Sequence, residues 1–280
     1  MKLAQIGPRG AERPIVEHQG RWFGFESIRP QIDPGFWGDG TMTRIREALD
    51  RSALPEVSVE GQRFGAPITR PSAIICLGHN YHAHVAESAG VEPTAPIIFL
   101  KTPNTLGGPD DDVPIPRGGE KTDWEVELGV VIGQRASYLA SPAEALGHIG
   151  GFVAVDDLSE RRFQFELSGG QFSKGKACAG FCPTGPYLVT ADSLDPGDLR
   201  LRSWVNGQPR QDSTTADMIF DVATIVHDLS QYLVLEPGDL ISTGSPQGVA
   251  SSGRFPFLTA GDVVEVEIDQ LGHQRHRFIA

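Results

Sequence analysis

Short apolar runs that end at glycine, proline or aspartate recur along most of this chain. Runs of this length between turn-forming residues are typical of β-strands. The pattern predicts strands at 74–78, 97–100, 126–132, 152–155, 187–190, 201–205, 239–243 and 263–268. Helical spacing of apolar residues is rarer and predicts helices at 141–146, 160–167 and 220–232. We therefore expect a strand-rich α+β fold and not a regular alternation of strands and helices.

The segment before about residue 65 differs from the rest, because it is rich in arginine, glutamate and proline. Its pattern predicts two short strands at 15–18 and 22–25 and one helix at 43–52. The glycine- and proline-containing stretch at 65–71 is typical of a linker. We therefore expect a small N-terminal domain at 1–68 and a larger domain at 69–280.

The composition is that of an ordinary globular protein, with 39% hydrophobic and 21% charged residues. Its apolar runs are shorter than the roughly 18 to 20 residues that a membrane-spanning helix needs. The first ten residues lack the apolar stretch of a secretion signal, so we expect a soluble, cytoplasmic protein with no membrane partner. Cys76, Cys178 and Cys182 are odd in number and lack metal-site spacing, which indicates reduced thiols.

The formal net charge of −12 makes nucleic acid and anionic lipid unfavourable partners over most of the surface. An anionic substrate would need a local cationic group or a bound metal to offset this field. Every candidate for such a group lies after the N-terminal segment.

Two glutamates, Glu125 and Glu127, lie at the start of the strand predicted at 126–132. Successive side chains of a strand point to opposite faces, so both carboxylates share one face. Held close together in an apolar strand they repel each other, and a bound cation would reverse the sign of that interaction. On its own, such a pair is also typical of the solvated face of an amphipathic strand.

A second acidic element, Asp156 and Asp157, directly follows the strand predicted at 152–155. Carboxylates at strand ends are well placed to converge on a shared ion. Three oxygen ligands without cysteine suit Mg²⁺ or Mn²⁺, with Ca²⁺ as a further option and Zn²⁺ less suited. Spacing alone does not decide which aspartate would be the ligand.

Three of the eight histidines lie directly after the strand predicted at 74–78. If this segment is helical, His84 and Glu87 lie three residues apart on one face. The carboxylate could then orient the imidazole as a general base that activates water. The alternative is a polar loop whose histidines have no catalytic role.

Two basic positions complete the candidate chemistry. Arg161, with Gln164 three residues later, could bind a substrate carboxylate through its guanidinium fork. Lys176 could serve as a point charge beside a developing enolate. A Schiff-base lysine is an alternative that a metal site makes unnecessary. Each of these residues, taken singly, is also typical of a surface charge.

Taken together and in this order, these segments resemble the fumarylacetoacetate hydrolase superfamily. The resemblance extends from about residue 74 to the C-terminus, over several independent motifs. They read GHNYHAHVAE, IIFLKTPNTLGGPDDDVPIP, TDWEVELGVVIG, GFVAVDDLSERRFQ, GKACAGFCPTGPYLVT, VNGQPRQDSTTADMIF, LEPGDLISTGSPQGV and AGDVVEVEIDQLG.

The resemblance implies a metal held by Glu125, Glu127 and Asp157, with Asp156 at a position where the family usually has Asn. It also implies a catalytic pair in a mobile lid at about 79–93. That pair corresponds to His84 and Glu87, and Lys176 joins it as a catalytic group. The family fold is a mixed β-roll or sandwich, usually assembled as a homodimer.

Substrate contacts are also implied, by two further motifs. They fall on Tyr81, Arg161, Gln164, and on Thr243 and Ser245 of the Thr-Gly-Ser-Pro turn. Serine keeps the hydroxyl of the family's usual Thr-Gly-Thr-Pro, so we expect that contact to persist. His79 departs from the family pattern and is a candidate for altering substrate choice.

The leading hypothesis is hydrolytic cleavage of a C–C bond in a 2,4-dioxo acid, such as an acylpyruvate or a fumarylacetoacetate-like substrate. The metal would bind the 2-oxo acid oxygens, His84 with Glu87 would activate water, and Lys176 would help to stabilise the enolate that remains.

The first alternative is other metal–enolate chemistry on the same scaffold: oxo-acid decarboxylation, isomerisation, sugar-acid dehydration or ureidoglycolate cleavage. A second is a non-catalytic member of the superfamily, against which the complete set of candidate residues argues. Fold resemblance alone does not decide between them.

Overall fold

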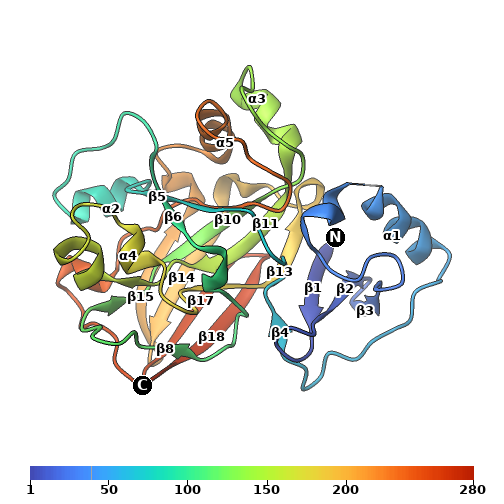
Figure 1. The fold of residues 1–280 in the computed structure, drawn as a ribbon, viewed down its shortest axis with the longest axis horizontal. Coiled ribbons are helices and arrows are strands. Elements are labelled where there is room, and N and C mark those ends of the chain that lie inside the picture. Colours follow the sequence, from blue (N-terminus) through green and yellow to red (C-terminus); the bar gives the residue numbers. More distant parts are fainter. Residues whose placement is uncertain (39) are drawn as a thin grey trace.

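The computed structural model describes residues 1–38 and 40–280 of the chain, and its largest element is an eleven-stranded mixed sheet (Figure 1). Its strands are β1 (Lys2–Ile6), β2 (Arg13–His18), β3 (Arg21–Gly24), β4 (Phe64–Gly65), β5 (Ile74–Gly78), β6 (Ile97–Lys101), β7 (Leu106–Gly107), β10 (Val126–Ile132), β11 (Ile149–Asp156), β13 (Cys182–Thr190) and β16 (Leu240–Ser242). The main path runs β3-β2-β1-β13-β11-β10-β16-β5-β6, with β4 beside β1 and β7 beside β13.

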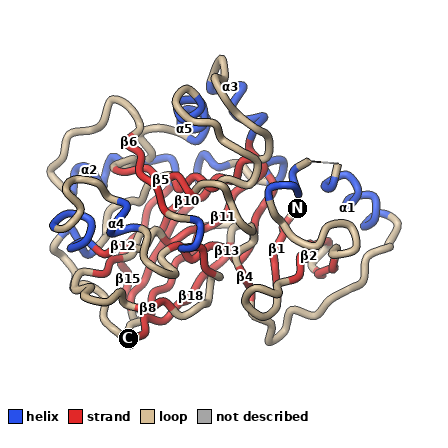
Figure 2. Tube along the Cα trace, in the orientation of Figure 1, coloured by secondary structure: helices blue, strands red, loops and turns tan. Residues whose placement is uncertain are grey.

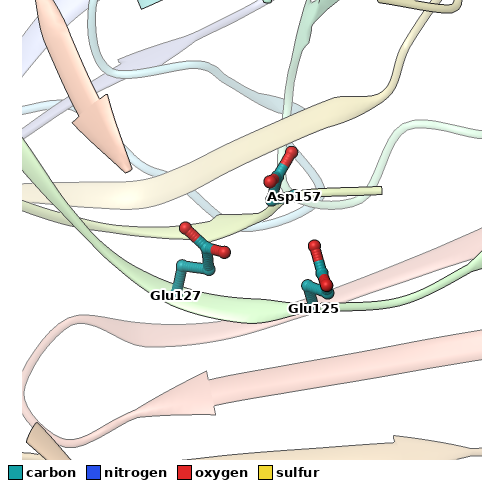
Figure 3. A group of neighbouring side chains, drawn as sticks. All are labelled: Glu125, Glu127 and Asp157. Atoms are coloured by element: carbon teal, nitrogen blue, oxygen red, sulfur yellow. The ribbon is translucent and has the colours of Figure 1, made fainter. Parts of the chain in front are cut away.

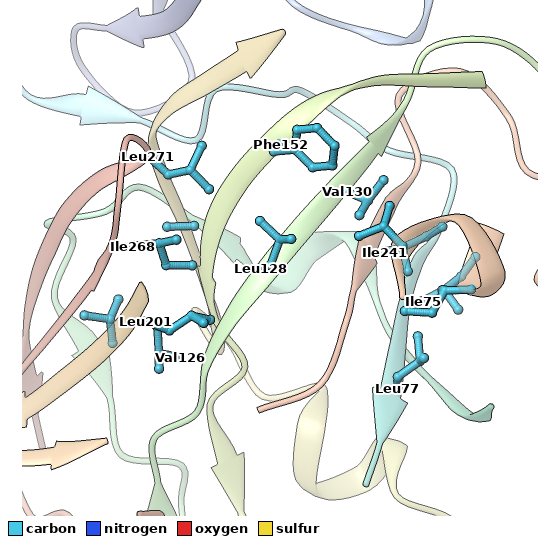
Figure 4. Packing of buried hydrophobic residues seen from close by; sticks show 14 of the residues in the cluster. Ile75, Leu77, Val126, Leu128, Val130, Phe152, Leu201, Ile241, Ile268 and Leu271 are labelled. Atoms are coloured by element: carbon cyan, nitrogen blue, oxygen red, sulfur yellow. The ribbon is translucent and has the colours of Figure 1, made fainter. Parts of the chain in front are cut away.

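A second sheet of five strands packs on one face of the first. It contains β8 (Val113–Pro114), β14 (Arg200–Val205), β15 (Gln208–Thr214), β17 (Val263–Ile268) and β18 (Gly272–Ile279), in the order β15-β14-β17-β18-β8. Val126 and Leu128 of β10 share one buried cluster with Leu201 of β14 and Ile268 of β17 (Figure 4). The main hydrophobic core therefore lies between two sheets.

Helices lie around the margin of this strand-rich body (Figure 2). They are α1 (Thr41–Asp50), α2 (His82–Glu87), α3 (Pro142–Ala145), α4 (Ser173–Lys176) and α5 (Val222–Ser230). In α5 the Asp221 carboxylate caps the helix by accepting from Thr224 N at 2.8 Å, and Ile225 and Leu229 pack into the core. Among residues 1–38 and 40–280, no helix combines the length and the apolar character needed to cross a membrane.

Strand β10 is buried along its whole length because it lies between β11 and β16 and has a core on each face. Val126, Leu128 and Val130 face the core between the sheets, while Val131 belongs to the cluster on the opposite side. Gly129 allows β10 to pack closely on Val153 of β11, because an added Cβ would lie only 2.8 Å from a side-chain carbon of Val153. The site-bearing strand is thus fixed on both sides.

The N-terminal segment extends the main sheet. Strand β1 pairs antiparallel with β13, with Leu3 opposite Leu188. Leu3 and Val16 share a buried cluster with Leu188 and Leu240. The division expected near residue 68 thus crosses a shared core, and it stays a prediction, as does the expected homodimer.

The strand-rich α+β class is confirmed, and each of the ten predicted strands is present, including those at 15–18 and 22–25. The helix expected at 160–167 is present as a π-helix, Arg162–Glu166, that begins later than predicted, after strand β12 (Ser159–Glu160). The reason is that Ser159 and Glu160 pair with Asp123 and Thr122 of β9 (Thr122–Asp123). The longer strands β1, β15 and β18 and the two-residue strands β4, β7, β8, β9 and β12 had no counterpart in the predicted pattern.

Candidate metal centre and active site

A cavity of about 480 Å³ opens between α2, the start of β10 and the turn after β12. It is lined by Leu77, Gly78, His79, His84, Glu87, Ser88, Phe99, Glu125, Glu127, Arg161, Gln164, Phe165, Phe172, Lys176, Ser245, Val249, Ser251 and Ser252. The acidic, histidine and basic motifs, which lie far apart in the sequence, therefore converge on one space.

Three buried carboxylates converge on one side of this cavity. Glu125, Glu127 and Asp157 each place an oxygen within 4.8 Å of the other two (Figure 3). Glu127 lies in β10 and Glu125 directly precedes it, and alternation along this extended chain directs both side chains to the same face. Asp157 reaches them because it directly follows β11, which is antiparallel to β10, and Asp157 N donates to Glu125 O at 2.9 Å.

The neighbouring Asp156 points elsewhere. One of its oxygens accepts from Glu125 N at 2.8 Å, and the other lies 2.8 Å from His276 Nε2. Asp156 therefore supports the backbone of Glu125 and takes no place in the carboxylate cluster. This placement separates the two aspartates that sequence spacing left undecided.

Three buried cationic side chains surround the carboxylates. Lys176 Nζ contacts Glu125 and lies 2.7 Å from Asp157 Oδ2. Lys101 Nζ lies 2.6 Å from Asp157 Oδ1, and Arg161 Nη2 donates to Glu125 Oε1 at 2.6 Å. Burial alone would raise the pKa of Glu125, but Arg161 and Lys176 outweigh it and hold that pKa well below its usual range.

Glu127 lies in a different electrostatic environment. Burial and the nearby charges of Asp157 and Glu125 raise its pKa well above the usual range. Its carboxylate accepts from Ser242 Oγ at 2.5 Å and from Gly244 N at 2.9 Å. Gly244 has a φ of 97°, and an added Cβ would lie 2.8 Å from Asn80 Cβ, so this turn requires glycine. The protein's own groups thus leave part of the negative charge uncompensated.

These residues fit a small divalent cation. The cluster offers carboxylate oxygens alone, which is the donor set that Mg²⁺ and Mn²⁺ prefer. The raised pKa of Glu127 shows that a third negative charge is unfavourable here without further positive charge. Glu125, Glu127 and Asp157 could together hold such an ion, with Lys176 and Arg161 fixing their orientation.

The predicted catalytic pair, on α2, lines the same cavity. His84 Nδ1 lies 3.7 Å from Glu87 Oε2, as expected for residues three apart on a helix. Burial is the largest influence on His84 and lowers its pKa. A neutral imidazole beside a carboxylate can accept a proton, which a general base requires. The ring of His79 stands edge-on to the ring of His84, with 5.9 Å between the ring centroids. The backbone of His79 has a φ of 56°.

Three of the five predicted contact residues, Arg161, Gln164 and Ser245, line the cavity, as does the catalytic candidate Lys176. The other two contact residues are placed differently. Tyr81 is completely buried at the start of α2, outside the cavity lining, and its hydroxyl has no hydrogen-bond partner among the described residues. Thr243 donates its hydroxyl to Leu128 O at 2.9 Å. Substrate contacts by these two residues stay predictions.

Sequence reasoning missed two charged residues and one wall of the site. Lys101 ends the edge strand β6, and its ammonium also donates to Leu158 O and Lys176 O. Asp123 binds Arg161 Nε at 2.8 Å and accepts from Ala250 N at 2.7 Å. The missed wall of the cavity is formed by the aromatic side chains of Phe99, Phe165 and Phe172. The one available signal was a lysine at the end of the apolar run IIFLK.

The chain is similar to known hydrolases along nearly its whole length. Residues 73–279 match the family model described as "Fumarylacetoacetate (FAA) hydrolase C-terminal". The 2,4-didehydro-3-deoxy-L-rhamnonate hydrolase of Sphingomonas sp. (strain SKA58) is 41% identical over 285 residues, covering 99% of this chain and 95% of the relative.

Two solved structures have the same fold over the whole chain. Fumarylacetoacetate hydrolase from Exiguobacterium antarcticum superposes with a TM-score of 0.83 at 33% identity, covering 100% of this chain and 99% of that one. Maleylpyruvate hydrolase from Sphingobium sp. SYK-6, in complex with manganese(II) ion and pyruvate, gives 0.78 at 27% identity, with the same coverage.

Proposed function

The chain belongs to the fumarylacetoacetate hydrolase family, and we propose that it is a divalent-cation-dependent hydrolase that cleaves a C–C bond of a 2,4-dioxo acid. The observation that carries this proposal is that two chemical groups line one cavity. Glu125, Glu127 and Asp157 form an oxygen cluster, and His84 with Glu87 forms a candidate water-activating pair.

Glu125, Glu127 and Asp157 would hold Mg²⁺ or Mn²⁺. When bound, the cation supplies Lewis-acid stabilisation of negative charge on the 2-oxo acid part of the substrate. Arg161, Gln164 and Ser245 present polar groups to the same space and would orient the substrate carboxylate. A bound cation would add the positive charge that this cluster lacks and that an anionic ligand needs against the protein's net charge of −12.

His84 takes a proton from water, while Glu87 fixes the imidazole orientation. The resulting hydroxide adds to carbon 4, and the bond between carbons 3 and 4 breaks. Carbon 3 keeps the electron pair as an enolate and then gains a proton. The products are pyruvate and a carboxylic acid derived from the distal acyl group. The buried ammonium of Lys176 stabilises the developing negative charge.

The cavity walls favour a short substrate with a polar distal group. Phe99 and Phe172 close one side, whereas His79, Ser251 and Ser252 offer hydrogen-bonding groups elsewhere along the lining. The substrate named for the Sphingomonas relative, 2,4-didehydro-3-deoxy-L-rhamnonate, is a 2,4-dioxo acid with such a hydroxylated end. We therefore propose a dioxo acid of the sugar-acid type as the first substrate to test.

A substrate panel tests this proposal. Purified protein is incubated with 2,4-didehydro-3-deoxy-L-rhamnonate, a simple acylpyruvate or oxaloacetate, in the presence of Mg²⁺, Mn²⁺ or a chelator. Pyruvate is the common readout. The proposal expects the dioxo acids to be turned over with either cation and not with the chelator.

Cation-dependent decarboxylation of an oxo acid is the second candidate. It is favoured by the ion pairs that Lys101, Lys176 and Arg161 make with the acidic cluster, which use no residue of α2. Enolate chemistry that needs no activated water, including isomerisation, dehydration or ureidoglycolate-type cleavage, would use that cluster alone. Faster turnover of oxaloacetate than of every dioxo acid would favour this candidate.

A further inference from the structure

The carboxylate of Glu87 has partners beyond His84. Its side chain is 11% exposed and accepts from Gly248 N at 3.0 Å through Oε2. Its other oxygen, Oε1, contacts Arg254 Nη2. Glu87 therefore joins α2 to the chain segment 248–254, and one residue of that segment, Arg254, supplies the cation.

Segment 248–254 forms part of the same cavity. Val249, Ser251 and Ser252 line it. The segment is anchored at its base, because Asp123 accepts from Ala250 N at 2.7 Å and from Ser251 N at 3.0 Å. The same Asp123 binds Arg161, so the segment is fixed to the carboxylate side of the site.

Gly248 allows this close approach. Its φ is 105°, and an added Cβ would lie 2.3 Å from Arg210 O, so both the conformation and the space require glycine. The Trp124 indole donates to Gly248 O at 3.2 Å and holds the peptide from its other side. The amide that Glu87 accepts from is thus held between close neighbours, of which Trp124 is completely buried.

Helix α2 depends on such contacts for its position. It has six residues, and so short a helix has little stability of its own. Val85 is buried, and Ala83 N donates to Asp217 Oδ2 at 3.1 Å. At the C-terminal end of the helix, Glu87 makes the contact that faces the cavity.

We propose that Arg254 is a positioning residue that holds Glu87, and with it α2, against segment 248–254. In this role it fixes the carboxylate that orients His84 and keeps the two walls of the cavity together. The inference rests on the proposed hydrolytic function for its catalytic consequence, and on the geometry alone for its effect on α2.

A purely structural role for Arg254 is disfavoured by its exposure. Its side chain is 54% exposed, and an ion pair at such a surface contributes little to overall stability. Loss of this guanidinium should therefore leave the fold intact. It should instead release a carboxylate whose orientation matters for the reaction.

Arg210 provides a matched control. The guanidinium of Arg210 lies 4.7 Å from the centre of the Phe255 ring, and that of Arg254 lies 5.4 Å from the same ring. No hydrogen bond or ion pair joins Arg210 to Glu87 within the described part of the chain. Arg210→Met thus removes a cation from the same aromatic neighbour and leaves the Glu87 contact in place.

The test compares the wild type with Arg254→Met, Arg254→Gln, Arg254→Lys and Arg210→Met, after thermal unfolding has verified that each is folded. Three rates are measured at saturating Mn²⁺: dioxo-acid cleavage, oxaloacetate decarboxylation, and proteolysis within 79–93. We expect both neutral Arg254 variants to lower kcat for cleavage about 10-fold, since they disorient a general-base pair. The KM for cleavage should change less than about 2-fold, because substrate binding is retained. The rate of oxaloacetate decarboxylation should also change less than about 2-fold, because it needs no activated water.

Proteolysis should be faster in both neutral variants, Lys should restore part of kcat, and Arg210→Met should match the wild type. The proposal is overturned if the neutral variants match the wild type in proteolysis, or if Arg210→Met causes the same losses. If the wild type cleaves no dioxo acid, the proposed function fails, and the proteolysis rates alone decide the role of Arg254.

Discussion

The carboxylate of Asp156 lies 2.8 Å from the imidazole Nε2 of His276, and both side chains are completely buried. This contact joins the last strand, β18, to the end of β11. The other oxygen of Asp156 accepts from the backbone N–H of Glu125. The family usually has Asn at the position of Asp156. A carboxylate buried at this position needs a hydrogen-bond donor, and His276 provides it.

The Asp156–His276 contact predicts a clear order of stabilities. His276→Leu should lower the free energy of unfolding by about 3 to 5 kcal/mol, because a buried carboxylate loses its partner. Asp156→Asn should cost about 1 kcal/mol, since the amide can still accept from Glu125 N and donate to the imidazole. Urea unfolding of both single variants and of the double variant measures these changes. If the double variant is simply additive, the coupling between the two residues is absent.

Metal removal gives a second prediction. Chelation should abolish turnover, and Mg²⁺ or Mn²⁺ should restore it and raise the thermal midpoint, because a ligand that binds the folded state alone stabilises it. The Glu125→Gln/Glu127→Gln double variant should show neither effect. A chelator-treated protein that keeps full activity would falsify the metal assignment.

Glu127→Gln tests charge repulsion in the same cluster. Removing one of three close carboxylates should leave the metal-free protein at least as stable as the wild type, because the lost charge repels Asp157 and Glu125. The variant should lose the stabilisation that added Mn²⁺ gives the wild type. Calorimetric scans with and without Mn²⁺ measure both quantities. Marked destabilisation of the metal-free variant would contradict this view of the cluster.

Thiol reactivity gives a prediction about pH. Burial raises the pKa of Cys182 to about 12 and that of Cys76 well above its usual range, and it also raises that of the half-buried Cys178. Since the thiolate is the reactive form, a raised pKa means slow alkylation that becomes faster as pH rises. At about pH 8, native protein should be modified at Cys178 at most, and unfolded protein at all three positions. Mass spectrometry after alkylation with iodoacetamide measures this, and rapid native labelling of Cys182 would contradict it.

Hydrolysis and decarboxylation should separate by mutation of the α2 pair. His84→Ala and Glu87→Gln should lower dioxo-acid cleavage roughly 10²-fold or more, in the range of a lost general base. Oxaloacetate decarboxylation needs no activated water, so it should fall much less if the enzyme supports it. Pyruvate is measured in both assays at saturating metal. Unchanged cleavage by His84→Ala would shift the assignment to the decarboxylase or lyase alternative.

The sequence was sufficient where one local rule decides the geometry. Alternation in β10 is enough to direct Glu125 and Glu127 to one face, and helical spacing is enough to bring His84 to Glu87. The choice of Asp157 over Asp156 came from the family resemblance, and the cluster geometry agrees with it. No local rule could make that choice, because it depends on the register between β10 and β11, which places Asp156 opposite Val126 and Asp157 beside Glu125.

Other features depend on tertiary contacts that no local pattern contains. Strand β18 carries inward-pointing Gln274 and His276, so its buried face is polar and lacks the hydrophobic alternation of a typical strand. Lys101 is fully buried because its charge meets Asp157 and two carbonyl groups of distant segments. The Arg254–Glu87 pair likewise joins residues 167 positions apart.

The most direct test of the central claim is the fate of water oxygen during turnover. A 2,4-dioxo acid is incubated with the protein and Mn²⁺ in ¹⁸O-labelled water, and the products are analysed by mass spectrometry. We predict equal amounts of pyruvate and of a carboxylic acid whose new carboxylate oxygen comes from the water. Release of carbon dioxide, or a product that retains every carbon atom of the substrate, would contradict hydrolytic C–C cleavage.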